Sequence, residues 1–141
     1  MDFEKGDSKK YTDFTPDDIK KYLDNFRNYV LDGKYSISRT ENRRENIEFI
    51  EDYKIDTRKE KEILLSIQYD DFCYAVGNNK EAFAHERLYI FCKLYELDQW
   101  GTLAIVEIYI KTNVIQTRRG EDFLIVVSFH KRNKPIKYLF K

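Results

Sequence analysis

Three side chains in the C-terminal half have the residue types that cleavage of a phosphodiester requires: Tyr109, Lys111 and His130. An imidazole gains or loses a proton near neutral pH, because its unperturbed pKa is about 6.5. A lysine ammonium stabilises the charge that develops at phosphorus. A tyrosine ring can orient a phosphate or stack on an unpaired base, which is how proteins usually hold single-stranded RNA. These types suffice for RNA cleavage without a metal ion.

Strand geometry predicts that these residues share one surface. Alternate residues of a strand point to the same face, and the first strand has on one face Tyr109, Lys111 and Asn113. The next strand is expected to bury an apolar face made of Phe123, Ile125, Val127 and Phe129. Its opposite face then holds Leu124, Val126, Ser128, His130 and Arg132. Because the two strands form a hairpin, we expect the polar sets to lie on the same side of the sheet.

Further residues are candidate contacts to the substrate, namely Tyr74, Glu86, Ser128, Lys131 and Arg132. The whole chain has 25 basic and 25 acidic residues, which argues against a general polyanion binder. Residues 111–141, however, contain eight basic and two acidic residues, a formal net charge of +6. A segment of this kind is either a phosphate-binding surface or an ordinary solvated chain end.

The same pattern also has an explanation without chemistry. Polar residues alternate with apolar ones on any half-exposed sheet, and a histidine at a strand end is often only solvated. Two other functions therefore stay open beside RNA cleavage. One is binding of a partner protein or a nucleic acid without cleavage, and the other is a structural or regulatory role without contact to nucleic acid.

The elements that would position these residues begin with a sheet. From Tyr69 onward, β-branched and aromatic residues dominate, and four strands are predicted near residues 71–76, 87–97, 103–115 and 123–131. Turn-forming residues separate them, at 77–79, 98–101 and 119–122. Connections this short force antiparallel pairing. Residues 136–140 are a candidate last edge segment.

Helical patterns precede the sheet. Thr15-Pro16-Asp17-Asp18 supplies a capping hydroxyl, a proline at the first position and carboxylates near the helix N-terminus, and Gly33 ends the helix. Its apolar residues recur at helical spacing: Ile19, Tyr22, Leu23, Phe26, Tyr29 and Val30. After a short extended piece at 35–37, a second helix is predicted over 40–53, with an apolar side of Ile47, Ile50 and Tyr53. A third begins with the capping-box pattern Thr57-Arg58-Lys59-Glu60 and continues into an apolar stripe of Ile63, Leu64 and Ile67.

Together these patterns predict an α+β fold, in which N-terminal helices pack on an antiparallel sheet of four or slightly more strands. Residues 1–14 show no periodicity and are expected to be a mobile segment before a single domain at 15–141. Cys73 and Cys92 have no partner pattern, so neither a disulfide framework nor a zinc site is supported, and no cofactor is expected. The absence of a long apolar run predicts a cytoplasmic protein without a membrane contact.

Several short strings, in order, resemble the motility quorum-sensing regulator toxins, the MqsR family. The leading ones are Leu23 to Gly33, Ser36-Ile37-Ser38-Arg39-Thr40, Ile63-Leu64-Leu65-Ser66, Asp71-Phe72-Cys73-Tyr74 and Leu88-Tyr89-Ile90-Phe91. The most telling are Ile108-Tyr109-Ile110-Lys111 and Val126-Val127-Ser128-Phe129-His130. The resemblance covers about residues 19–140.

This resemblance implies a RelE/ParE-like fold and a ribosome-independent mRNA endoribonuclease, the toxin of a type II toxin-antitoxin pair, held inactive by a cognate antitoxin protein. Tyr109 and Lys111 stand where the family has its active-site tyrosine and lysine, and His130 stands where it has a lysine. Two positions depart from the family: Tyr74 replaces a lysine and Glu86 replaces a glutamine. A carboxylate near phosphate repels it, so a reduced or altered activity is the alternative that these two residues raise.

Overall fold

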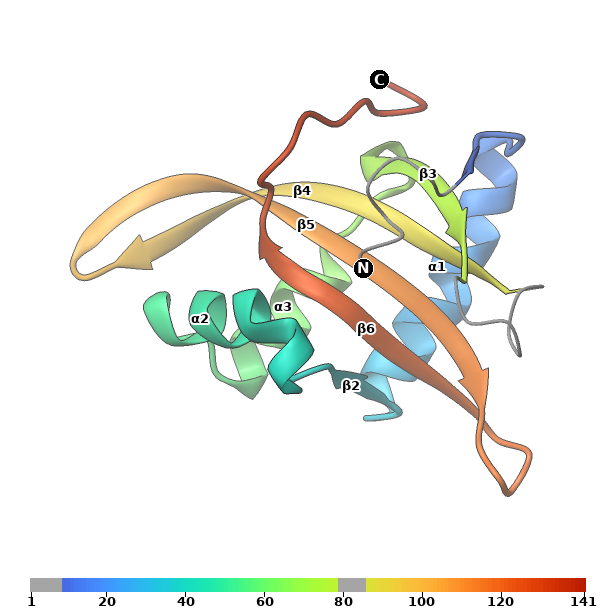
Figure 1. The fold of residues 1–141 in the computed structure, drawn as a ribbon, viewed down its shortest axis with the longest axis horizontal. Helices are drawn as coiled ribbons and strands as arrows, with labels where there is room; N and C mark the ends of the chain where they lie inside the picture. The colour runs from blue at the N-terminus through green and yellow to red at the C-terminus, as the bar shows by residue number, and fades with distance from the viewer. Residues whose placement is uncertain (1–8, 79–85) are drawn as a thin grey trace.

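The computed structural model describes residues 9–78 and 86–141, and in this part of the chain three helices accompany a six-stranded sheet (Figure 1). The α-helices are α1 (Pro16–Leu31), α2 (Arg44–Asp52) and α3 (Thr57–Leu65), with single 3-10 turns at Glu41–Arg43 and Tyr69–Asp71. The strands are β1 (Lys10–Tyr11), β2 (Tyr35–Ile37), β3 (Phe72–Gly77), β4 (Arg87–Gln99), β5 (Thr102–Gln116) and β6 (Asp122–Lys131). The predicted α+β class is confirmed.

The sheet is larger than the predicted one and mixed. Its strand order is β1-β3-β4-β5-β6-β2, and the four predicted strands form its antiparallel centre. The short extended piece after α1 becomes β2, which pairs in parallel with β6. At the opposite edge, β1 pairs with β3, so two residues of the segment expected to be mobile form a strand. Residues 1–8 and 79–85 lie outside the described part, and with them the turn residue Asn79.

The predicted N-terminal cap of α1 is confirmed, and that of α3 is wrong by one residue. Thr15 caps α1 as predicted: its Oγ1 accepts a hydrogen bond from the Asp18 N–H at 3.2 Å, and Asp18 Oδ2 accepts one from the Thr15 N–H at 2.8 Å. In α3 the cap is Asp56 rather than Thr57, and Asp56 Oδ1 accepts a hydrogen bond from the Lys59 N–H at 2.8 Å. A threonine hydroxyl and an aspartate carboxylate can both accept hydrogen bonds from the free N–H groups of a first helical turn. In α3, Asp56 stands at the N-cap position, and Thr57 is already the first residue of the helix.

The helices bury the larger core against one face of the sheet. Its members from α1 and α3 are those that the spacing predicted, including Ile19, Leu23, Phe26, Val30, Ile63 and Leu64. The sheet contributes, among others, Phe72, Phe91, Ile108, Ile110, Val126 and Phe129. In Figure 1, α1 runs behind the sheet and α2 lies next to β6. No helix in the described residues is long and apolar enough to cross a membrane.

The opposite face of the sheet has a smaller apolar cluster, formed by Cys73, Tyr74, Val76, Ile90, Cys92 and Tyr109. Ile136 and Tyr138, which follow β6, pack against it. Residues 136–140 are therefore a covering segment rather than the expected edge strand, and the Leu139 N–H donates to the Phe72 carbonyl at 3.0 Å. Both thiols are free and buried in this second cluster.

The predicted apolar side of α2 is confirmed only in part. Tyr53 is buried and Ile50 packs partly buried against the main core, but Ile47 does not belong to it, and the fully buried residues of α2 are Asn46 and Phe49. The buried side includes an amide, and a pattern of apolar residues alone cannot indicate a polar residue that faces the core. Asn46 is buried because its side chain replaces a missing strand neighbour of β6.

A bulge in β6 decides which of its residues face the helices. At the hairpin end, Gln116 pairs with Asp122 and Thr112 with Val126, but the next pair along β5 is Lys111 with Ser128. Val127 is thus one extra residue in β6. As a result Val126 and Phe129, three residues apart, both enter the core on the helix side.

The predicted buried face of Phe123, Ile125, Val127 and Phe129 is therefore wrong at all members but Phe129. The members from the other predicted face, Leu124 and Val126, are fully buried against the helices. Simple alternation fails because Val127 interrupts it.

Asn46 holds this bulge from the β2 side. Beyond the end of β2, Asn46 Nδ2 donates to the carbonyl oxygens of Ser38 at 2.9 Å and Val127 at 3.0 Å, and Asn46 Oδ1 accepts from the Phe129 N–H at 2.8 Å. One side chain therefore satisfies three backbone groups in a buried place, where each would be costly to leave unpaired.

Replacing Asn46 by alanine is expected to lower the free energy of unfolding by about 3 kcal/mol, because three buried backbone groups lose their partner. Urea denaturation followed by circular dichroism measures this loss. The matched control is Asn25→Ala on the exposed side of α1, which is expected to change the free energy by less than about 0.5 kcal/mol. Equal effects of the two substitutions would show that Asn46 is not a structural anchor.

Candidate functional site

The structure places Tyr109 and His130 side by side on the sheet face opposite the helices. They are direct partners in the β5–β6 ladder, and their rings are stacked with centroids 5.4 Å apart and planes 23° from parallel. Without the bulge, the register set at the hairpin would pair Tyr109 with Phe129 and Ile108 with His130. His130 would then point toward the helices, so the bulge brings the predicted pair together.

The two ring nitrogens of His130 have different surroundings. Nδ1 lies 2.8 Å from the Lys131 carbonyl oxygen, which can only accept, so Nδ1 carries the proton in the neutral ring. Nε2 points toward Glu45 of α2, whose Oε1 lies 3.9 Å away. The other oxygen of Glu45 accepts a hydrogen bond from Asn133 Nδ2 at 2.6 Å. Nε2 is therefore the nitrogen that can exchange a proton, and it lies next to the Glu45 carboxylate.

Lys111 shares this face but is not at the surface. It pairs with Ser128 of β6 and with Ile90 of β4, and its exposed fraction is 1%. Ser128 is also buried, and Tyr109 is 5% exposed. The His130 side chain is 12% exposed and is the most accessible of these four residues. The predicted residues are thus neighbours, but most of them lie below the surface.

Arg132 belongs to a cluster that closes one side of the site. Its Nε donates to Glu107 Oε1 at 2.5 Å, and the hydroxyl of Tyr138 donates to Glu107 Oε2 at 2.5 Å. Partial burial alone would raise the pKa of Glu107, but these hydrogen bonds outweigh it, so the pKa lies below its ordinary value. These contacts hold the segment after β6 against β5. They also engage the guanidinium of Arg132, which was predicted to bind substrate, in an ion pair with Glu107.

Other predicted contacts lie apart from His130. Lys131 pairs with Ile108, so its side chain points toward the helix side of the sheet. Glu86 accepts hydrogen bonds from Asn78 and Asn113, each at 3.1 Å, and holds the start of β4 to β5. Tyr74 is on the same face as Lys111, but Ile90 of β4 lies between them. The strand register therefore turns Lys131 away from His130.

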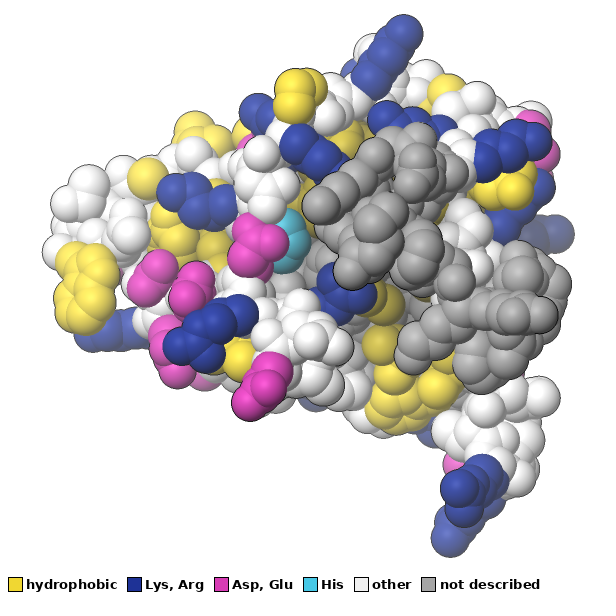
Figure 2. Space-filling model, in the orientation of Figure 1, with side chains coloured by type: hydrophobic (Ala, Val, Ile, Leu, Met, Phe, Trp, Pro, Cys, Tyr) yellow, Lys and Arg dark blue, Asp and Glu magenta, His cyan; other side chains and the backbone are white. Residues whose placement is uncertain are grey.

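Two residues that complete the site were not foreseen. Glu45 comes from α2, and Lys134, after β6, lies with its Nζ 5.7 Å from the Tyr109 ring centroid. Nothing in the sequence links either residue to the strands, apart from the basic character of the last segment. In Figure 2, Lys or Arg and Asp or Glu side chains are interspersed over this view, and the coloured part of the surface has no continuous basic patch.

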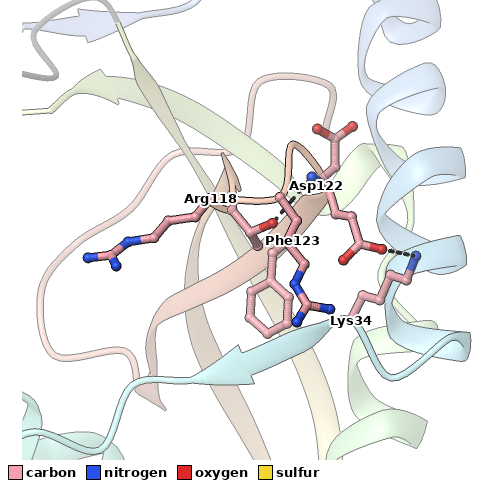
Figure 3. Close-up of a pocket in the computed structure, with 7 residues that line it drawn as sticks. Lys34, Arg118, Asp122 and Phe123 are labelled. Atoms are coloured by element: carbon pink, nitrogen blue, oxygen red, sulfur yellow. Dashed lines mark hydrogen bonds and ion pairs between the residues drawn. The ribbon is translucent and has the colours of Figure 1, made fainter.

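In the described part of the chain, the surface has hollows at two places away from His130. One, of about 460 Å³, lies at the tip of the β5–β6 hairpin, where Lys34, Arg118, Asp122 and Phe123 line it (Figure 3). There Lys34 forms an ion pair with Glu121 at 3.8 Å. The other, of about 570 Å³, lies between β3 and the covering segment and is lined by residues such as Lys10, Tyr74 and Tyr138.

In the described residues no cluster of His, Cys, Asp or Glu has a metal-binding arrangement. Comparison of the chain with protein-family models, with curated proteins and with solved structures finds no match.

The contact to Lys131 predicts an unusual tautomer. In the neutral form of His130 we expect the proton on Nδ1, because the carbonyl accepts it. Long-range ¹H–¹⁵N correlation spectra of the imidazoles measure this directly, and His130→Gln identifies the resonances. A neutral ring with its proton on Nε2 would contradict the arrangement.

The cluster around Glu107 predicts a pH dependence. Because its pKa is lowered in the folded state, its contribution to stability is present above its unfolded pKa of about 4.3 and is lost as pH falls through the lowered value. Glu107→Gln is therefore expected to lower the free energy of unfolding by about 1–2 kcal/mol at pH 7. Below about pH 4 the difference from the unsubstituted protein should shrink. A pH-independent difference in urea denaturation would show that the carboxylate charge is irrelevant.

Proposed function

We propose that this chain is an endoribonuclease that cuts single-stranded RNA. The observation that carries the proposal is the stacked Tyr109–His130 pair, in which the backbone fixes the imidazole and leaves Nε2 next to Glu45. Attack of the ribose 2′-oxygen on the neighbouring phosphorus needs a base to take the 2′-OH proton and an acid to protonate the leaving 5′-oxygen. The resemblance to the MqsR family supports the same reaction.

Glu45 is the general base of the proposed reaction and His130 is its general acid. Glu45 accepts the proton of the ribose 2′-OH, and the 2′-oxygen attacks the neighbouring phosphorus. Protonated His130 gives its Nε2 proton to the 5′-oxygen as the P–O5′ bond breaks. The products are a 2′,3′-cyclic phosphate and a free 5′-hydroxyl, and no metal ion enters the reaction.

The cations and the ring complete the site. Lys134, which reaches over the Tyr109 ring, neutralises the phosphate from the solvent side, and Lys111 contributes positive charge from within the sheet. Tyr109 orients the imidazole by stacking. In the cell, such an enzyme acts in the cytoplasm as the toxin of a toxin-antitoxin pair, cuts mRNA and is restrained by a cognate antitoxin protein.

Burial of the predicted residues favours a second candidate function. Tyr109 and Lys111 are almost inaccessible, so a substrate phosphate cannot reach Lys111 without a rearrangement of the face. A protein with the same arrangement and no cleavage would bind a partner or a nucleic acid through the residues around the covering segment. Its binding to RNA would weaken steeply with salt and yield no product.

Incubation of the purified protein with single-stranded RNA and EDTA distinguishes the two functions. Cleavage is expected, with cyclic phosphate ends, and His130→Ala is expected to slow it by about 10²–10⁴-fold, as for loss of a general acid. Glu45→Gln should cause a loss of similar size. Induced expression is expected to arrest growth, and His130→Ala should relieve the arrest.

The control is Lys21→Ala, an exposed lysine of α1 on the helix side, which should leave cleavage unchanged. Lys111→Met keeps the length of the buried side chain and tests its charge. Salt-sensitive RNA binding without product would favour the second function. Full activity of the His130→Ala and Lys111→Met variants together would refute the mechanism.

A further inference from the structure

The β4–β5 hairpin extends beyond the rest of the sheet as a two-stranded arm, residues 94–107. Among the described residues, β3 pairs with β4 only as far as Phe91, and β6 pairs with β5 only from Ile108 onward. The pairs from Leu94 with Glu107 to Gln99 with Thr102 therefore have no further strand on either side. Figure 1 shows this arm projecting from the end of the sheet.

One face of the arm is covered and the other is bare. On the covered face, Leu97 and Val106 belong to the main core, and the Tyr95 hydroxyl donates to Glu62 of α3 at 2.6 Å. On the bare face lie three aliphatic side chains: Leu94 at 56%, Leu103 at 66% and Ile105 at 72% exposure. Figure 2 shows hydrophobic side chains at the surface at this end of the molecule. Exposed apolar groups that gather in one place mark an interaction site.

The tip of the arm presents the single tryptophan of the chain in a backbone conformation that bulky residues avoid. Trp100 and Gly101 form a two-residue turn with φ of 56° and 89°, a geometry that favours Asn-Gly. Trp100 is nevertheless 74% exposed, with Lys54 Nζ 4.9 Å from its ring. The left-handed backbone and the high exposure are unusual for a tryptophan, and tryptophan is a preferred anchor in protein interfaces.

The free edge of β4 has a defined chemical pattern. Its exposed side chains on the bare face include Glu96 and Asp98, and in the described chain neither forms an ion pair. Residues 94–107 contain three acidic residues and no basic one. On the covered face of the same strand, Tyr95 packs partly buried against the main core and Leu97 is buried in it. A strand added to this edge would therefore place alternate residues beside carboxylates and beside apolar groups.

We propose that the arm is a docking site for a partner protein, which adds a strand with alternating basic and apolar residues to the edge of β4. Lys or Arg side chains of the partner face Glu96 and Asp98, its apolar side chains extend the surface of Tyr95 and Leu97, and Trp100 anchors its end. The main-chain hydrogen bonds of such an added strand supply affinity and the side chains supply specificity. This inference is independent of the proposed nuclease activity.

A second copy of the chain does not fit this edge. Antiparallel pairing of two β4 edges centred on Leu97 would place Glu96 and Asp98 of one molecule across from the same acidic residues of the other. Like charges directly opposite in a ladder are destabilising. The occupant must therefore bring the opposite charge.

The test uses the full chain and a capped ten-residue peptide of alternating lysine and valine. Because Trp100 is the only tryptophan, its fluorescence reports on the arm directly. Binding at concentrations below about 1 mM is expected, and a peptide of alternating glutamate and valine should bind at least about tenfold more weakly. The double variant Glu96→Lys, Asp98→Lys should reverse this preference. Circular dichroism checks that the variant keeps its fold.

A third peptide separates strand addition from charge attraction alone. It has the lysine-valine sequence with N-methyl groups on alternate residues, so that the N–H groups facing β4 are blocked. At least about tenfold weaker binding of this peptide is expected. Equal binding of the methylated peptide, equal binding of the acidic peptide, or no binding would each overturn the proposal. So would sedimentation as a dimer that Glu96→Arg disrupts, because the occupant would then be a second copy.

Discussion

The Asn46 side chain holds the backbone of β6 where the strand leaves its regular register. β2 ends before this point, so the Val127 carbonyl and the Phe129 N–H have no strand partner on that side and bind the buried amide instead. A bulge at a buried position is stable only if its free polar groups are satisfied. The main core and the candidate site both depend on it, because it places Phe129 toward the helices and His130 beside Tyr109.

The sheet has two covered faces, and this shapes any chemistry at the site. Helices bury one face, and the segment after β6 packs on the other, held by the contacts of Glu107 with Arg132 and Tyr138. Lys111 and Ser128 are buried in this second layer, while His130 lies near its border with α2. In the proposed reaction, proton transfer therefore takes place at Nε2, and Lys111 contributes its charge from below the surface.

Local patterns predicted the elements well. The Thr15 cap, the helical spacing of α1, the apolar stripe of α3 and the four central strands all follow from residue types within a few positions of one another. The predictions that failed involve partners far apart in the chain. The place of Asn46 on the buried side of α2 was missed because this residue is polar. β1 was missed because two residues show no pattern of their own, and the extended piece at 35–37 gave no sign that it pairs with β6.

Residue types and their spacing predicted a helical N-terminal half followed by an antiparallel meander, with Tyr109, Lys111 and His130 on one face of neighbouring strands. The predicted alternation placed the wrong residues of β6 in the core, however, and the regular register from the hairpin would have turned His130 toward the helices. An amide 83 residues before Phe129 stabilises the bulge that reverses this. The bulge, the nearness of Glu45 and the burial of Lys111 emerged only in the folded chain. Each of these depends on which segments meet in space, and alternation along one strand contains no information about its neighbours.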